Sequence, residues 1–483
     1  MIRTPALDLF PVLPELILAG AGILALLYQA LAPRPKVEGH LALALAGLAA
    51  AAGASIALWD RTGDPTVLAG AIQADKFAVV ARLVILAVAA VGLLYGAHYY
   101  DRSGDEARGE FYPLVLFATM GMTLITAAAD LIVTFLALEI LSLSLYVLTG
   151  LSRRGQATEA SMKYFLLGAF SSAFFLYGVA MAYGATGTTR IPAVAHALAG
   201  QTGSQALALT AFGFLAIGFG FKVSAVPFHM WTPDVYQGAP TPVTAFMAAA
   251  TKVAAFGALI RVLDVSFHPL AWSWEPVIWV VAALSVIVGS VLAIAQSDVK
   301  RMLAYSSVAH AGFILTGLTS SNQDGIRAAL FYLIAYAVMT LGSFGVVMLV
   351  SARGEEQTSL ASYAGLGRRQ PLLAGLMALF LLSLAGIPPT AGFIAKVGVF
   401  GAAIRAGHWP LVLIGVLSSV VAAFFYLRVI VLMYMQEPAG EQLEDRAVLP
   451  RAALAIPAAL TLVLGVFPQI VLGVLDKASV LRW

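Results

Sequence analysis

Apolar residues form continuous runs of roughly 20 residues along the whole chain, each long enough to cross about 30 Å of hydrocarbon as a helix. The runs are rich in Ala, Leu and Val and do not alternate with polar residues, which favours helices over barrel strands. About fourteen spans are predicted, at residues 12–31, 40–59, 77–97, 112–128, 131–150, 164–186, 206–226, 240–262, 277–296, 302–319, 327–351, 371–406, 409–435 and 452–475. The pattern therefore predicts an all-α polytopic membrane protein.

Composition supports this fold class. Of 483 residues, 60% are hydrophobic and 11% charged, whereas a soluble domain carries about a quarter charged residues. The longest connections, near 187–205, 352–370 and 436–451, are too short for a soluble domain, so residues 1–483 are expected to form one transmembrane domain in the lipid bilayer. A net charge of +3 does not indicate a nucleic-acid-binding surface. The lack of cysteine excludes iron–sulfur clusters held by thiolates of this chain.

Basic residues gather in the odd-numbered connections between spans. Because cytoplasmic loops are enriched in Lys and Arg, these connections are predicted to be cytoplasmic, and an even number of spans places both termini outside. The basic residues concerned are Arg34, Lys36, Arg102, Arg108, Arg153, Arg154, Lys300, Arg301, Arg353, Arg368, Arg369, Arg446 and Arg451.

Two spans contain helix breakers close to a lysine: Gly218–His229 includes Lys222 and Pro227, and Gly386–Lys396 includes Pro388-Pro389. Proline interrupts a helix, and such breaks persist in a membrane only where protein or cavity water covers the freed backbone groups. A pair of broken helices in corresponding halves points to an ion path in transporters built from inverted repeats. Ordinary proline kinks are the alternative for either break alone.

Ionisable residues near the middle of apolar spans are the candidate chemistry. Glu139 and Lys222 are expected to pair, and a lysine whose carboxylate partner approaches and retreats can alternate between its charged and neutral forms. A static salt bridge that pins two helices is the alternative. Lys252 is expected to relay protons rather than to reach a membrane interface.

The second half of the proposed path contains two more ionisable residues. Lys396, after the second break, is the candidate for the exit half, and His310 is a natural bridge because histidine titrates near neutrality. A hydrogen-bonded packing role is the alternative for His310. His229 and Asp234 lie beyond the first break, where they shape a cytoplasmic entrance or cap a helix. Lys163 lies near a span end, where anchoring is expected.

These motifs resemble one family. The run Phe221–Tyr236 is similar to the central signature of the antiporter-like membrane subunits of respiratory complex I (NADH:quinone oxidoreductase). The continuation Gln237–Phe246 with Lys252 is similar to subunit N in particular, and so are Pro14–Leu18, Asp298–His310 and Gly386–Phe393 with Lys396. The resemblance covers essentially the whole chain. Lysine rather than glutamate at 396 differs from subunit M, and no lateral helix like that of subunit L follows the last span.

The resemblance implies fourteen helices in two inverted five-helix repeats, the fourth to eighth and the ninth to thirteenth spans, with the seventh and twelfth helices broken. It divides the chain into N-terminal helices (1–111), a first repeat (112–262), a second repeat (277–435) and a last helix (452–475). It implies a glutamate on the fifth helix, lysines on the seventh and eighth helices, and a lysine or glutamate on the twelfth, and Glu139, Lys222, Lys252 and Lys396 fit these places. Together with the candidate bridge His310, these residues form the predicted proton relay.

The resemblance also implies a setting. The chain would be a subunit of a proton-pumping translocase in the bacterial inner membrane, with periplasmic termini and with no redox centre or cofactor of its own. FMN, iron–sulfur clusters and quinone would belong to partner subunits, and the membrane partners would be subunit M and the small subunits J and K. A subunit of a multi-subunit sodium/proton antiporter, and a structural bridge whose charges only hold helices together, are the competing interpretations.

Overall fold

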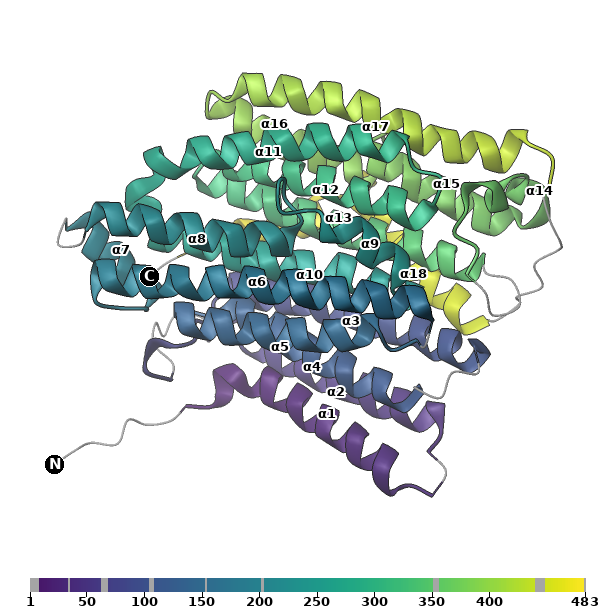
Figure 1. Ribbon diagram of the computed structural model, residues 1–483, viewed down its shortest axis with the longest axis horizontal. Coiled ribbons are helices and arrows are strands. Elements are labelled where there is room, and N and C mark those ends of the chain that lie inside the picture. Colours follow the sequence, from purple (N-terminus) through teal and green to yellow (C-terminus); the bar gives the residue numbers. More distant parts are fainter. Residues whose placement is uncertain are drawn as a thin grey trace.

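Long helices run side by side through the molecule, which Figure 1 shows from one face. The computed structural model describes residues 8–33, 35–61, 68–103, 108–152, 154–200, 204–350, 356–438 and 448–481, and no β-strand occurs among them. Several basic residues of the odd-numbered connections lie outside these ranges, namely Arg34, Arg153, Arg353 and Arg446, and so do the side chains of Arg102 and Arg108.

The predicted all-α membrane fold is confirmed. Twelve helical segments in the described ranges are long and apolar enough to cross a membrane. The two further predicted spans are α12 and the broken pair α15–α16. The helices are α1 (Leu13–Leu31), α2 (Val37–Ala57), α3 (Lys76–Ser103), α4 (Arg108–Ala127), α5 (Leu131–Thr149), α6 (Gly155–Thr186), α8 (Gln205–Val223), α10 (Thr241–Arg261), α11 (Ala271–Ile294), α12 (Val299–Leu318), α13 (Gln323–Leu349), α15 (Pro371–Ala385), α16 (Ala391–Arg405), α17 (Trp409–Met435) and α18 (Val448–Val466).

Some element boundaries differ from the sequence-based expectation. The connection 187–205 contains a short helix, α7 (Ile191–Ala199), and the connection 352–370 contains α14 (Leu366–Arg369). The last predicted span, 452–475, is two helices, because α18 ends at Val466 and α19 (Gln469–Ala478) follows Pro468. Proline cannot donate the hydrogen bond that would continue the helix, and a purely apolar window does not detect that interruption.

Side-chain caps fix where several helices begin. Asp130 accepts a hydrogen bond from Ile132 N at 2.7 Å at the start of α5, and Asp298 accepts one from Arg301 N at 2.9 Å at the start of α12. These oxygens satisfy backbone N–H groups that have no partner within the helix. The start of α12 is therefore set by Asp298 although its first turn carries two basic residues.

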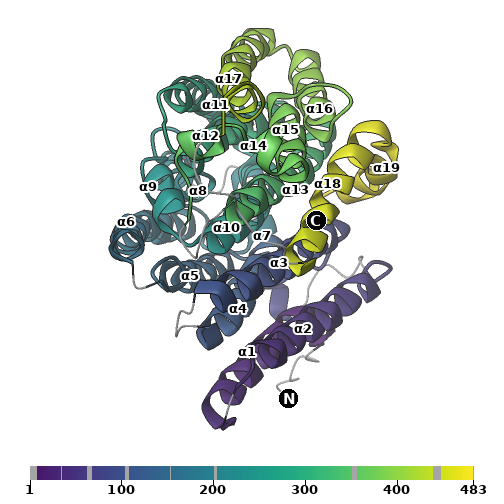
Figure 2. The same cartoon turned by 90° about the vertical axis from the view of Figure 1, so that its right-hand side faces the viewer.

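Helices α10 and α13 form the core of the bundle. Every residue of α10 is buried, and α13 packs along it (Figure 2). Protein on all sides of α10 excludes lipid from it, so Lys252 in this helix must find its partners within the protein.

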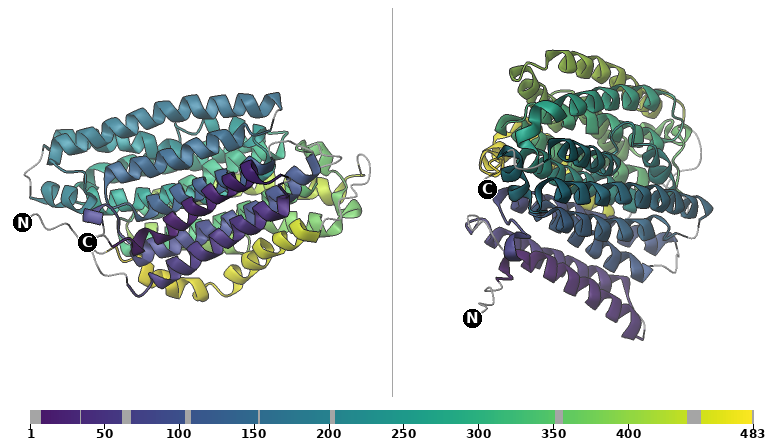
Figure 3. Two further views of the ribbon diagram at one scale, coloured as in Figure 1. Left: turned by 90° about the horizontal axis from the view of Figure 1, so that it is seen from below. Right: turned by 60° about the vertical axis from the view of Figure 1, so that its left-hand side comes forward.

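The N-terminal helices are tied to the bundle by buried ion pairs. Arg82 of α3 donates to Glu15 of α1 at 3.0 Å, and Arg261 of α10 donates to Asp75 at 2.6 Å. At the opposite end of the chain, α18 and α19 lie along α3 and α13 (Figure 3). The N-terminal and C-terminal ends of the described chain lie at the same end of the bundle (Figure 1), as an even number of spans requires.

Candidate functional site

Two helix breaks share one local geometry. The first lies between α8 and α9 (Trp231–Gly238), and the second lies between α15 and α16. Ser224 (φ 63°) and Gly386 (φ 88°) adopt the left-handed conformation directly after the first half-helix. The next residue then bonds back across the turn, Ala225 N to Gly220 O at 2.8 Å and Ile387 N to Leu382 O at 3.0 Å. This is a standard helix C-terminal cap, formed twice in corresponding halves of the chain.

A buried lysine binds the last carbonyl before each break. Lys252 Nζ donates to Val223 O at 2.8 Å, and Lys396 Nζ donates to Ala385 O at 2.8 Å. Carbonyls at a helix C-terminus have no partner within the helix and carry partial negative charge, which stabilises a cation. The breaks therefore provide the acceptors that make a buried ammonium group tolerable.

Lys222 lies in the last turn of α8, beside the first break. Its Nζ donates to Ser142 Oγ of α5 at 2.7 Å and lies 5.4 Å from the ring centroid of Tyr164, close enough for a cation–π interaction. The side chain is 3% exposed. A serine hydroxyl and an aromatic face stabilise the ammonium group here without a carboxylate in contact.

Glu139 is near Lys222 but not paired with it. Its carboxylate accepts a hydrogen bond from Ser172 of α6. A small cavity, with about 10 Å³ open to water-sized molecules, is lined by Ser142, Ser172 and Lys222, among others. That volume is at the lower limit for one water molecule, roughly 10–15 Å³. The structure thus has the two charges apart, each bonded to its own serine on the wall of this cavity.

Helix α12 connects the first and second breaks. Ser307, His310 and Phe313 are spaced three residues apart and therefore share one face of the helix. Ser307 O accepts from Lys252 Nζ at 2.8 Å, and Lys396 Nζ lies 4.7 Å from the ring centroid of Phe313. His310 lies between these two lysine contacts, as the bridging interpretation requires.

Two tyrosines hold the imidazole of His310. Its Nδ1 is 2.8 Å from the hydroxyl of Tyr332, and its Nε2 is 3.3 Å from the hydroxyl of Tyr426. Tyr426 also bonds Ser306 of the same helix. Since a hydroxyl can donate and accept, these partners can accompany a change of tautomer at His310.

The structure brings Lys252, His310 and Lys396 together around α12, places Lys222 one residue before Val223, and leaves Glu139 at the edge of the bundle. Sequence reasoning missed several partners whose signal was a polar side chain inside an apolar span: Ser172, Tyr332, Ser419 and Tyr426. Ser419 accepts a hydrogen bond from Lys396 at 3.2 Å.

A charged cluster surrounds α9 at the end of the bundle. Asp234 binds Lys163 of α6 at 2.8 Å and Arg301 of α12 at 2.6 Å. Asp234 and Lys163 therefore join three helices, which goes beyond the capping and anchoring roles weighed from the sequence.

Glu356 and Lys300 form a second ion pair at the same end. Lys300 Nζ donates to Glu356 at 2.8 Å and to Ala239 O at 2.6 Å, and the carboxylate also accepts from Thr241 N. Burial by itself raises the pKa of Glu356, but the Lys300 charge and these hydrogen bonds hold the pKa below its usual range. A polar pocket of about 190 Å³ adjoins the pair and is lined in part by Arg154 and Gln237.

Within the described ranges, no group of three or more His, Asp or Glu residues is arranged to hold a metal ion. The polar side chains gathered around the two breaks and α12 are ammonium, imidazole and hydroxyl groups, which can donate or accept protons.

Comparison with known proteins places this arrangement in a family. Residues 128–422 match the family described as NADH:quinone oxidoreductase/Mrp antiporter, transmembrane. NADH-quinone oxidoreductase subunit N of Rhodococcus opacus is 46% identical over 526 residues, covering 99% of this chain and 97% of that protein. The chain belongs to the subunit N family. NADH-quinone oxidoreductase subunit N of Acidothermus cellulolyticus is 47% identical over 506 residues, covering 99% of this chain and 97% of that protein.

Solved membrane complexes contain chains with the same fold. A chain of respiratory complex I from Thermus thermophilus with bound aureothin superposes with a TM-score of 0.81 at 37% identity, covering 96% of this chain and all of that one (100%). A chain of the archaeal membrane-bound sulfane sulfur reductase gives a TM-score of 0.85 at 27% identity, with 99% and 97% covered. A chain of the Mrp complex from Dietzia sp. gives 0.84 at 22% identity, with 97% of each chain covered, and shares the fold.

Proposed function

We propose that this chain is a proton-translocating membrane-arm subunit of NADH:quinone oxidoreductase. Partner subunits would carry out the redox chemistry with FMN, iron–sulfur clusters and quinone, and this chain would respond through conformational and electrostatic coupling. The observation that carries the proposal is the row of Lys252, His310 and Lys396 along α12, between two helix breaks. Ionisable groups held this way inside a membrane bundle are characteristic of proton relays.

Uptake is proposed at the charged end of α9. The polar pocket beside Glu356 lies at the junction of α9 and α10, on the side that carries the basic connections. From there a proton would reach Lys222, under the electrostatic control of Glu139. Because serines separate the two charges, a small movement of α5 or α6 changes their interaction.

Onward transfer is proposed from Lys222 to Lys252 across the last turn of α8, and then through His310 to Lys396. Lys252 binds the carbonyl of the residue that follows Lys222, so a change at the first break alters both lysines. The hydroxyls of Tyr332 and Tyr426 offer proton acceptors and donors on both sides of the imidazole. Lys396 would release the proton through the second break.

The setting of the subunit is part of the proposal. Glu139 is only partly buried, between the exposed Leu136 and Leu143 on the same helix. A carboxylate facing acyl chains is costly, so another membrane subunit would cover this face. We propose subunit M and the small subunits J and K as neighbours, in a bacterial inner membrane with periplasmic termini. The division into N-terminal helices, two repeats and a last helix is part of the same proposal.

Charge-neutralised variants of the intact complex test the function. Lys222→Ala and Glu139→Ala should abolish or severely reduce proton pumping in proteoliposomes, while Glu159→Ala should leave it unchanged. Glu159 is a matched control because its side chain is 66% exposed and its ion pair is with Lys163 on the same helix. Normal pumping by an assembled Lys222→Ala complex would overturn the assignment and would favour a structural bridge.

A sodium/proton antiporter subunit is the second candidate, and the fold shared with the Mrp complex favours it. Affinity purification from the membrane separates the two functions. Co-isolated flavin and iron–sulfur proteins support the complex I assignment, whereas a stable assembly without electron-transfer proteins supports the antiporter.

A further inference from the structure

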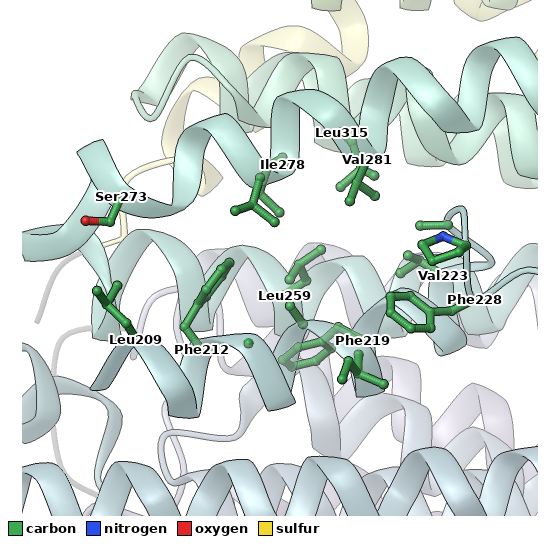
Figure 4. A pocket seen from close by; sticks show the side chains of 17 residues that line it. Leu209, Phe212, Phe219, Val223, Phe228, Leu259, Ser273, Ile278, Val281 and Leu315 are labelled. Carbon is green, nitrogen blue, oxygen red and sulfur yellow. The ribbon is translucent and has the colours of Figure 1, made fainter. Parts of the chain in front are cut away.

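A lateral crevice lies between α8 and α11, with α10 and α12 behind it (Figure 4). Its volume is about 510 Å³, within the range of about 300–1,000 Å³ that small-molecule sites occupy. Ser273 is the only one of its 17 lining residues with a polar side chain. The crevice is separate from the lysine and histidine relay, none of whose residues lines it.

The crevice opens on the outer surface of the bundle. Helices α8 and α11 lie on the same face of the bundle (Figure 1), and Gly213 and Val277 at the opening are exposed. From Leu209 to Val223 the crevice follows α8 for about 21 Å at 1.5 Å per residue. This length is roughly two thirds of the ~30 Å hydrocarbon core, so the crevice runs from one side of the core past its middle.

The two ends of the crevice differ in chemistry. Ser273 lies near Leu209, towards the start of α8, and its hydroxyl is buried with no hydrogen-bond partner within the described ranges. The other end is closed by Val223 and Phe228, at the first helix break. A polar atom near the membrane surface and an apolar interior match an amphiphile whose tail points towards the middle of the bilayer.

We propose that the lateral crevice binds one acyl chain of a bilayer phospholipid, with the ester group beside Ser273 and the chain end against the first break. Water does not fill apolar cavities of this kind, and at this depth the surrounding solvent is acyl chain. The bound chain packs on Val223, whose carbonyl binds Lys252, and so supports the last turn of α8. This inference stands whether or not the subunit moves protons.

Photolabelling of the intact complex tests the site. The complex is placed in phosphatidylethanolamine nanodiscs with a trace of phosphatidylethanolamine that carries a diazirine near its acyl-chain end. Labelled peptides are then identified by mass spectrometry. We expect label on the residues around Val223 and Phe228 above the level found at lipid-facing residues such as Leu417 of α17. Label at or below that level would contradict the proposal, and so would a cross-link from the crevice to another subunit.

Filling the crevice should displace the lipid. A Cβ added at Gly213 meets no atom within 4 Å, so Gly213→Trp places an indole in open space at the mouth. We expect this change to bring labelling near Val223 down to background. Gly184→Trp, at an equally open site on α6, should leave it unchanged. Val277→Trp repeats the test from the opposite wall if the Gly213 variant does not assemble. Unchanged labelling in an assembled filled variant would refute the site.

The polar end is tested separately. Ser273→Ala should raise the amount of labelled lipid needed for half-maximal labelling about fivefold, the effect of losing one hydrogen bond. Equal titrations for Ser273→Ala and the unsubstituted complex would show that the ester group does not lie beside Ser273.

Discussion

At the scale of single residues, the lysines and the imidazole of the proposed relay bind hydroxyl and backbone carbonyl groups rather than carboxylates. Lys222 donates to Ser142, Lys396 to Ser419, and His310 bonds Tyr332. The sequence identified the ionisable residues, because a charge in an apolar span is conspicuous. It did not identify the hydroxyls, because Ser and Tyr are common in membrane helices and only the packing shows which of them face a charge.

Removal of the Tyr332 hydroxyl tests the role of these partners. Tyr332→Phe should slow proton pumping about fivefold, the effect of losing one hydrogen bond on the imidazole, with its ring packing retained. Tyr305→Phe, on the same helix as His310, is the control and should pump normally. Equal rates for both variants, measured in proteoliposomes, would show that the hydroxyl does not act on His310.

The Glu356–Lys300 pair predicts a pH dependence of stability. Because the pKa of Glu356 is lowered in the folded protein, its charge stabilises the fold fully above its ordinary value of 4.5. This contribution is lost as the pH falls through the lowered folded-state pKa. We expect Glu356→Gln to flatten the decline of the thermal midpoint below about pH 4.5, its ordinary value. If the thermal midpoint of this variant declined in acid as steeply as that of the unsubstituted protein, the Glu356 charge would not be the source of the pH dependence.

Lys300→Met tests the same pair from the other side. It leaves a largely buried carboxylate unpaired, which costs about 3–5 kcal/mol of unfolding free energy. Glu437→Gln breaks an exposed pair with Arg368, both more than half exposed, and should cost at most about 1 kcal/mol. Similar thermal midpoints for the two variants would show that burial does not strengthen the Lys300 pair.

At the scale of elements, the helix breaks organise the site. Both were predicted from helix breakers close to a lysine, and both occur. The short helices α7 and α9 were not predicted, because windows of about 20 apolar residues do not detect segments of eight or nine residues. The cap geometry could be predicted from the sequence at only one of the two breaks. Glycine at 386 indicates a left-handed residue, whereas serine at 224, which adopts the same conformation, does not.

A glycine substitution separates backbone strain from displacement of the lysine. Gly386 and Gly407 both have a left-handed φ, 88° and 87°, so alanine at either costs about 1–2 kcal/mol. Only at Gly386 would the new Cβ meet a functional side chain, Lys396 Cδ at 2.8 Å. Gly386→Ala should therefore reduce pumping, while Gly407→Ala should lower only the thermal midpoint. Equal pumping rates for the two variants would show that contact between Lys396 and the second break does not affect proton transfer.

At the scale of the whole molecule, the bundle surrounds a buried row of ionisable groups and leaves Glu139 at its edge. Periodicity and composition predicted the membrane fold, and prolines close to lysines predicted the two helix breaks. They did not predict that Glu139 lies on an outer face, because every residue of a membrane span looks interior in an apolar window. Three-dimensional packing alone separates the faces that meet protein from those that meet lipid or another subunit.

Coverage of this outer face can be measured with one introduced thiol, since the chain has no cysteine. Leu143→Cys, one turn from Glu139, should react with a membrane-permeant maleimide in the isolated subunit and be protected in the intact complex. Equal labelling in the two preparations would place the α5 face against lipid and would remove the support for a neighbouring subunit there.

The central claim is that protons pass through the buried row of side chains between the two breaks. The most direct test is the number of protons moved per NADH oxidised by the intact complex in proteoliposomes, with Lys252→Met compared with Lys477→Met. Lys477 lies in α19 with an exposed side chain. We expect a lowered ratio for Lys252→Met and an unchanged ratio for Lys477→Met. A normal ratio in an assembled Lys252→Met complex would show that protons do not pass through this row.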